Sequence, residues 1–155
     1  TGISEDPDVR FEVARRIVNR AADHGIPACD IVVDPLVMPI GAMGTAGQQV
    51  YKLLRRLVSE LKVNTTCGAS NVSFGLPNRN TITGTYLAMA ISNGMTSAIM
   101  NPLHAEVRSA VMAADVLAGN DRDCASDVIN YSTKKRPLSK AFFVSVHNSE
   151  MDDDS

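Results

Sequence analysis

The sequence predicts an α/β fold in which helices alternate with short parallel strands. The main observation is a weak internal repeat. Residues 24–36 (HGIPACDIVVDPL) and 93–103 (NGMTSAIMNPL) each hold a glycine that ends a helix, a short strand, and then Asp-Pro-Leu or Asn-Pro-Leu. Repeated αβ units imply parallel strands, which need helices on their faces. The composition, 45% hydrophobic and 21% charged residues among 155, is typical of a globular domain.

The N-terminal half predicts a helix, a strand and a second helix. Asp6 as N-cap and Pro7 as first helical residue start the first helix, which Gly25 ends. A β-branched strand follows and ends at Asp34-Pro35, and Thr45 is a possible cap for the second helix. Both helices carry apolar residues at helical spacing: Val9, Val13, Ile17 and Ala21 in the first, and Val50, Leu53, Leu54, Leu57, Val58 and Leu61 in the second.

The C-terminal half continues this alternation. Residues 62–70 predict a second strand, 80–93 a helix ended by Gly94, and 96–103 a third strand. Asn101-Pro102 is predicted to start a fourth helix, which Gly119 ends, and a short helix is expected near 122–130. We therefore expect one folded unit over residues 1–131. A polar, mobile extension is expected over 132–155, within which 141–150 could form a strand.

Charge and cysteine usage exclude several functional classes. The net charge of −2 and the pI of about 5.9 provide no positive field for nucleic acid. No run of about 18 apolar residues predicts a membrane span, and the acidic N-terminus has no signal-peptide pattern, so a cytoplasmic protein is expected. Cys29, Cys67 and Cys124 are widely spaced, which predicts neither a zinc site nor a disulfide framework.

Polar residues lie at the end of each predicted strand. Asp34 is at the end of the first strand, Ser70 and Asn71 are at the end of the second, and Asn101 is at the end of the third. Ligands of parallel α/β folds bind at the carboxyl ends of the strands. We therefore expect these side chains to converge on one mouth.

Each of these residues also has a simpler structural interpretation. Asp34 could cap the Asp-Pro turn, or its carboxylate could accept hydrogen bonds from an amidine-like edge of a pterin or guanine ring. Asn71 could be a turn residue, or its amide could serve a ligand nitrogen whose protonation changes during a reaction. Arg79 could be a solvated charge at a helix start or could meet an anionic ligand group. Asn101 is most simply an N-cap.

Three motifs, in this order and separation, resemble those of the methyltetrahydrofolate:corrinoid protein methyltransferases: DIVVDPLVMPIG, GASNVSFGLPNR and NGMTSAIMNPL. These enzymes are pterin-binding relatives of dihydropteroate synthase and of the folate domain of cobalamin-dependent methionine synthase. The resemblance covers about residues 1–130, and SNVSFGLPNR is its specific part. It implies a TIM barrel, of which this chain contains only the C-terminal part, about strands 6–8.

The resemblance also implies roles for individual residues. Asp34 matches the carboxylate that binds the pterin ring, and Asn71 matches the asparagine whose amide reaches N5. Arg79 and Ile99 match positions that line the folate site, and Asn101 is expected beside them. Phe74 stands where the best-known members have Gln, so it could stack on or cover the pterin but cannot hydrogen-bond it.

The implied reaction moves a methyl group from N5 of methyltetrahydrofolate to the Co(I) of a corrinoid carried by a partner protein, with no metal bound by this chain. A full barrel takes about 250 residues. We therefore expect either a missing N-terminal barrel half or a homodimer that covers the open edge, and weak or absent activity for this chain alone. Two alternatives are a non-catalytic αβ fragment that only binds or assembles, and a dihydropteroate synthase-like enzyme. The latter would have a Ser-Arg-Lys type loop in place of SNVSFGLPNR.

Overall fold

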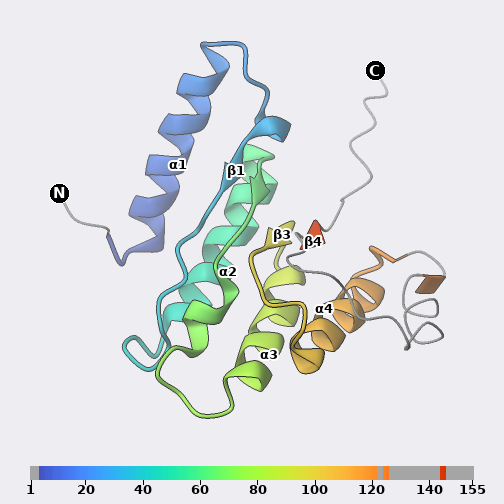
Figure 1. Cartoon of the computed structure of the whole chain (residues 1–155). Helices are drawn as coiled ribbons and strands as arrows, with labels where there is room; N and C mark the ends of the chain where they lie inside the picture. Colours follow the sequence, from blue (N-terminus) through green and yellow to red (C-terminus); the bar gives the residue numbers. More distant parts are fainter. Residues whose placement is uncertain (1–3, 122–123, 126–143, 146–155) are drawn as a thin grey trace.

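The fold is described from a computed structural model for residues 4–121, 124–125 and 144–145. The helix expected near 122–130 and the extension expected over 132–155 lie largely outside the described residues. Figure 1 shows the helices side by side in chain order, with the strands among them. They are α1 (Pro7–Ala22), α2 (Ala46–Arg56), α3 (Arg79–Ile91) and α4 (Ala105–Leu117).

Short parallel strands alternate with these helices, as the sequence predicts. β1 (Val32–Val33) pairs in parallel with β2 (Asn64–Thr65). β3 (Ser97–Ala98) follows on the other side of β2, through a parallel bridge between Gly68 and Ile99. The predicted α/β fold with alternating helices and parallel strands is therefore confirmed. β4 (Val144–Ser145) lies within the segment expected to form a strand and pairs antiparallel with β3.

Two buried threonines join β2 to β3. The N–H of Thr65 donates to Oγ1 of Thr96 at 2.8 Å, and the N–H of Thr96 donates to Oγ1 of Thr65 at 3.0 Å. Oγ1 of Thr96 also donates to the carbonyl of Thr65 at 3.0 Å. These bonds satisfy backbone groups that burial removes from water, so they fix the alignment of the two strands.

The apolar row predicted on α1 is not its buried face. Asp6 caps the helix as predicted, since Oδ1 accepts a hydrogen bond from the N–H of Asp8 at 2.8 Å. Phe11 and Ala14 are the buried side chains, whereas Val9, Val13 and Ile17 are 47%, 40% and 58% exposed. Phe11 packs with Leu53, Leu57 and Val63, and the guanidinium of Arg56 lies 3.7 Å from its ring centre. The larger aromatic ring therefore decides which side of α1 is buried.

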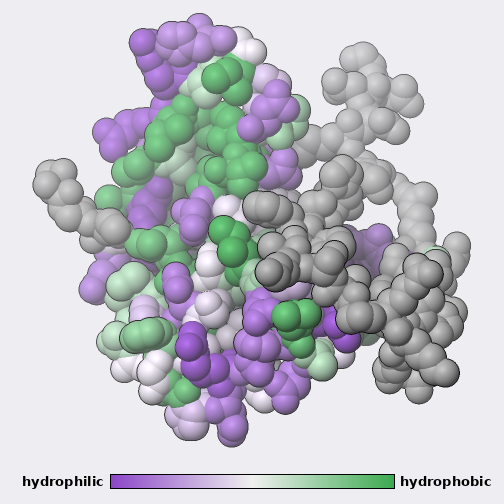
Figure 2. Space-filling model, in the orientation of Figure 1, coloured by the Kyte–Doolittle hydropathy of each residue, from purple (hydrophilic) through white to green (hydrophobic). Residues whose placement is uncertain are grey.

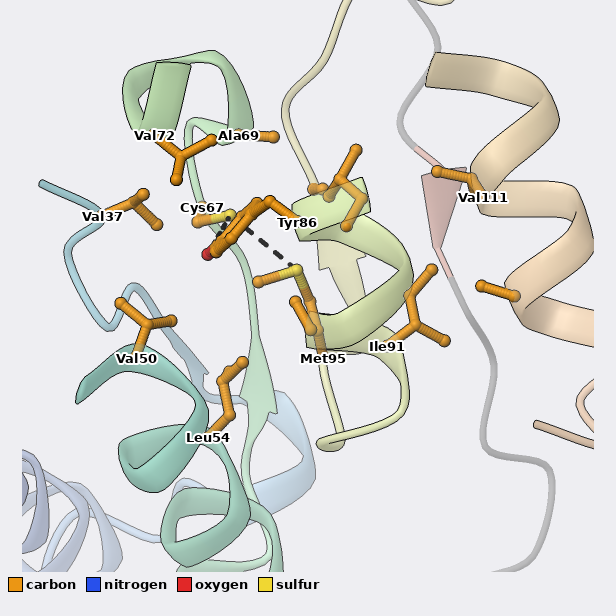
Figure 3. Packing of buried hydrophobic residues seen from close by; sticks show 14 of the residues in the cluster. Val37, Val50, Leu54, Cys67, Ala69, Val72, Tyr86, Ile91, Met95 and Val111 are labelled. Carbon is orange, nitrogen blue, oxygen red and sulfur yellow. Dashed lines mark hydrogen bonds between the residues drawn. The ribbon is translucent and has the colours of Figure 1, made fainter. Parts of the chain in front are cut away.

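The main core lies between the strands and the helices α2, α3 and α4. Figure 3 shows side chains of α2 and α3 pointing toward Cys67, which follows β2, with Tyr86 and Met95 close to its sulfur. The predicted apolar face of α2 is confirmed at Val50, Leu53, Leu54 and Leu57, which are buried. A π turn, η2 (Leu57–Leu61), extends this helix, and Lys62 ends it in the left-handed region with φ of 56°.

α4 begins later than the sequence predicts. Its first residue is Ala105 and its N-cap is His104, so the prediction that Asn101 caps this helix is wrong. Oδ1 of Asn101 instead accepts a hydrogen bond from the N–H of Leu103 at 3.0 Å. This local side-chain bond closes a turn and competes with helix initiation.

Candidate functional site

Three strand ends lie next to one another at the same edge of the fold. Val33 is opposite Thr65, and its carbonyl accepts a hydrogen bond from the N–H of Thr66, so Asp34 leaves β1 beside the continuation of β2. Ile99 makes backbone hydrogen bonds to both neighbours of Gly68. Its N–H donates to the carbonyl of Cys67, and its carbonyl accepts from the N–H of Ala69. Asp34, Asn71 and Ile99 therefore follow the carboxyl ends of three neighbouring parallel strands, where parallel α/β folds bind ligands.

The sequence repeat forms the same turn at two of these ends. Oδ1 of Asp34 accepts a hydrogen bond from the N–H of Leu36 at 2.8 Å, and Oδ1 of Asn101 accepts one from the N–H of Leu103 at 3.0 Å. The proline between the members of each pair is buried. The predicted turn function of Asp34 is therefore confirmed. It engages Oδ1 and leaves Oδ2 of this exposed carboxylate without a hydrogen bond from the described residues.

Asn71 lies in a 3₁₀ turn, η3 (Ala69–Ser73), that directly follows the second strand end. The N–H of Asn71 donates to the carbonyl of Gly68, and the N–H of Phe74 donates to the carbonyl of Asn71. The side chain is exposed and packs back over Gly68, and it makes no hydrogen bond to the described part of the chain. Its amide is therefore available to a ligand at the strand ends.

Arg79, the first residue of α3, reaches back to η3 rather than into solvent alone. Its Nη2 donates to the carbonyl of Ser70 at 2.9 Å, and its Nε donates to Oγ of Ser73 at 3.3 Å. Oγ of Ser73 also bonds Oγ1 of Thr83 at 2.9 Å in the buried interior. The guanidinium lies 5.7 Å from the ring centre of Phe74, which is 66% exposed. Arg79 thus fixes the loop that carries Asn71.

A pocket of about 410 Å³ lies between η3, the start of α3 and the turn after β3. It brings together Arg79, Ile99 and Asn101, three of the predicted site residues. Asp34, Asn71 and Phe74 do not line it, so the predicted residues divide between this pocket and the adjoining strand ends. The remaining lining residues are Ser70, Ser73, Asn80, Thr83, Met100, His104 and Val107.

Comparison of the sequence with known proteins identifies the family of this chain. A family model described as "Pterin binding enzyme" matches residues 4–101, which include all three strand ends. This chain belongs to the pterin-binding enzyme family. The sequence-based resemblance is thereby confirmed at the level of the family.

One relative adds detail to the comparison. Methylcorrinoid:tetrahydrofolate methyltransferase from Eubacterium limosum is 31% identical over 129 residues. The alignment covers 79% of this chain and 46% of the relative. The chain therefore spans about half the length of the relative that it matches.

In this member of the pterin-binding family, a buried pair of side chains, Cys67 and Tyr86, lies just after β2. Sγ of Cys67 is 3.7 Å from Oη of Tyr86 and 3.8 Å from Sδ of Met95 (Figure 3). Burial raises the pKa of Cys67 to about 12, against the opposing hydrogen bond from Tyr86, and the charge of Asp34 adds to the rise. Burial also raises the pKa of Tyr86. Both groups are therefore neutral, so this pair adds no charge near Asp34.

The described part of the chain holds no cluster of three or more His, Cys, Asp or Glu side chains that could bind a metal ion. None of its helices is long and apolar enough to cross a membrane.

Sequence reasoning missed several residues that shape the site. The sequence predicts no role for His104, yet its Nε2 lies 3.1 Å from Nδ2 of Asn101 in the pocket wall. Thr83 and Arg10 were also missed, although each holds a loop that carries a predicted site residue. These contacts join residues that are far apart in the sequence or in different elements, so local patterns do not reveal them. The repeated Asp/Asn-Pro-Leu motif is the one local pattern close to these residues.

Proposed function

We propose that this chain is part of a methyltransferase that moves a methyl group between N5 of a tetrahydrofolate and the corrinoid of a partner protein. Membership in the pterin-binding family and the name of the Eubacterium limosum relative support this proposal. The observation that carries it is the position of Asp34, Asn71 and Ile99 at the carboxyl ends of three adjacent parallel strands.

The donors and acceptors at these strand ends fit a pterin ring. Oδ2 of Asp34 is free to accept hydrogen bonds from the N–H groups along the amidine edge of the ring. Phe74 and Ile99 are 66% and 58% exposed and offer apolar faces that suit a flat heterocycle. Arg79 and Asn101 line the adjoining pocket, which suits the more polar part of the folate.

Asn71 carries the chemistry in this proposal. A tertiary amine is a poor leaving group, so N5 needs a proton or a strong hydrogen bond before its bond to the methyl carbon breaks. The Asn71 amide presents both a donor and an acceptor, and no described residue engages either. Held beside N5, this dipole would stabilise the charge that develops there, while Asp34 orients the ring.

The same contacts serve transfer in either direction. The sequence resemblance implies transfer from the folate to Co(I), whereas the name of the relative has a methylcorrinoid as donor and tetrahydrofolate as acceptor. Both directions pass through one transition state, so a group that stabilises it accelerates both. The corrinoid is a substrate here, brought by the partner protein.

We further propose that residues 1–131 form the C-terminal part of a TIM barrel, about strands 6–8. The parallel order of β1, β2 and β3 with helices between them supports this assignment. The edge of β1 away from β2 and the exposed apolar row of α1 suit packing against further barrel units or a second copy. Figure 2 shows hydrophobic side chains gathered over α1 and β1, where Val9, Val13, Ile17 and Val32 are exposed.

The proposal is tested by an Asn71→Ala substitution in the full-length protein, with Asn19→Ala as matched control. Asn19 is exposed on α1, away from the strand ends. We expect Asn71→Ala to slow methyl transfer by about 100-fold, the usual effect of removing one transition-state hydrogen bond. Calorimetric affinity for methyltetrahydrofolate should fall by less than about tenfold, since the bond matters most when N5 carries a proton. Asn19→Ala should change neither.

Each outcome separates the candidate functions. Absence of methyltetrahydrofolate binding by the wild-type protein would refute the proposal. Binding without methyl transfer to a corrinoid protein would favour a non-catalytic binding module. Displacement of pyrophosphate from a pterin pyrophosphate by the amine of p-aminobenzoate would favour the dihydropteroate synthase-like alternative. Equal losses of rate and affinity in Asn71→Ala would argue against the role of this amide at N5.

A further inference from the structure

The guanidinium of Arg10 spans from α1 to the turn that follows β1. Its Nη1 donates to the carbonyls of Pro35 and Leu36, at 2.8 and 3.1 Å. Its Nη2 donates to Oε1 of Gln49 on α2 at 3.0 Å and to the carbonyl of Glu5 at 3.1 Å. Each of its Nη hydrogens therefore has an acceptor, and Nε is buried without a partner among the described residues.

The turn that Arg10 holds has an unfavourable backbone conformation. Leu36 lies in the left-handed region, with φ of 60°, a conformation that is unfavourable for a residue other than glycine. This conformation aims the N–H of Leu36 at Oδ1 of Asp34, at 2.8 Å. Two charge-assisted hydrogen bonds to the Pro35 and Leu36 carbonyls oppose the strain. The carboxylate of Asp34 is thus oriented through backbone that Arg10 fixes.

The second copy of the repeat shows that this turn does not need such support in general. There, Nη1 of Arg108 lies 3.4 Å from the carbonyl of Pro102, a longer single contact. Leu103 is not among the described residues with positive φ. The extra bonds and the strained leucine are therefore specific to the turn that carries Asp34.

We infer that Arg10 is a positioning residue for ligand binding, which acts by holding the Asp34-Pro35-Leu36 turn so that the free oxygen of Asp34 faces the pterin. The inference rests on the proposed function, in which Asp34 binds the ring. A planar guanidinium can reach two carbonyls and Gln49 together, whereas the single ammonium of lysine cannot match this fork. Arg10→Lys therefore keeps the charge and removes the geometry.

The experiment compares Arg10→Lys with Arg16→Lys in the full-length protein. Arg16 is exposed on the same helix and makes no hydrogen bond or ion pair to the described residues, so it is a matched control. We expect amide hydrogen exchange at Leu36 to accelerate at least tenfold in Arg10→Lys and to stay unchanged in Arg16→Lys. Calorimetric affinity for methyltetrahydrofolate should fall about tenfold in Arg10→Lys alone. Unchanged affinity despite faster exchange at Leu36 would overturn the inference.

A double variant distinguishes positioning from a general structural effect. If Arg10 acts through Asp34, Arg10→Lys/Asp34→Asn should bind methyltetrahydrofolate no more weakly than Asp34→Asn does. Additive losses would mean that Arg10 does not act through Asp34, and would overturn the inference alone. Normal affinity of Asp34→Asn would instead refute the ring-binding carboxylate in the proposed function, and the inference with it.

A further variant covers the case in which Arg10→Lys does not fold. Loss of exchange protection at Leu54, buried in α2, would reveal that outcome. Gln49→Met then removes one acceptor that orients Nη2 of Arg10 and leaves the charge in place. It should accelerate exchange at Leu36 by a smaller factor and weaken folate binding in proportion. Normal exchange and normal affinity in Gln49→Met would count against the inference.

Discussion

The side-chain amide of Asn71 lies against the backbone of Gly68, so that a Cβ at Gly68 would be 3.3 Å from Nδ2 of Asn71. This distance is tighter than an ordinary van der Waals contact. Gly68 has φ of −75°, a value open to any residue, so its backbone does not require glycine. The missing side chain instead leaves the space that the Asn71 amide occupies at the strand ends.

Gly68→Ala should therefore move the Asn71 amide and slow methyl transfer by about tenfold, because small displacements of a positioned group are costly to rate. The melting temperature should change little. Gly44→Ala is the matched control, since nothing lies within 4 Å of a Cβ there. Methyl-transfer rates and thermal melts of the full-length variants provide the measurement. A normal rate in Gly68→Ala would show that the amide does not need its observed place.

Local signals predicted most of the helices and strands. Asp6-Pro7 begins α1, and Gly94, with φ of 95°, follows α3 as expected. The buried side of α1 and the start of α4 escaped prediction for different reasons. Packing of Phe11 against α2 and the Asn101 side-chain bond compete with helical periodicity and N-cap preference, and neither competition is visible in the sequence alone.

The sequence predicts which residues lie at the strand ends, but not the contacts that hold them in place. Asp34 and Asn101 were found because strand ends and a repeat mark them. The Asp-Pro pair indicates a turn as one interpretation of Asp34, whereas the sequence predicts that Asn101 caps a helix and not that it closes the same turn. The bond from Arg10 to the Pro35 carbonyl joins residues 25 positions apart, so no local pattern reveals it. The same holds for the bond between Ser73 and Thr83, which depends on how η3 meets α3.

Close packing of α3 on α4 depends on Gly84. A Cβ at this position would lie 3.1 Å from Cβ of Ala110 and 3.3 Å from the carbonyl oxygen of Glu106. Alanine is favoured over glycine in a helix by about 1 kcal/mol, but overpacking against a fixed backbone costs about 1–3 kcal/mol. The net of these two effects is a loss of about 0–2 kcal/mol, so we expect Gly84→Ala to lower the free energy of unfolding by about 1 kcal/mol in urea denaturation.

Gly47→Ala in α2 is the matched comparison for that measurement. Its Cβ would meet the Tyr51 ring at 3.5–3.7 Å, an ordinary contact. The helix preference for alanine then acts alone, so this variant should be as stable as the wild type or slightly more stable. A Gly84→Ala protein as stable as Gly47→Ala would mean that the two helices can separate at little cost.

Cys67 should make stability depend on alkaline pH. Its pKa rises from the ordinary 9.0 to about 12 in the folded protein because of burial. Above pH 9 the unfolded chain releases the thiol proton while the folded chain keeps it, so stability falls as pH rises. Cys67→Ala lacks this proton. The free energy of unfolding of the wild type, relative to that of the variant, should therefore drop by about 1.4 kcal/mol between pH 8 and pH 10.

Urea denaturation of the wild type and Cys67→Ala at both pH values tests this prediction. Tyr86 also has a raised pKa, but it is present in both proteins and largely cancels in the comparison. Thiol labelling adds an internal control, since exposed Cys29 should react with a disulfide reagent under native conditions while buried Cys67 should not. A stability difference that stays constant with pH, together with ready labelling of Cys67, would mean that water reaches the Cys67 thiol in the folded protein.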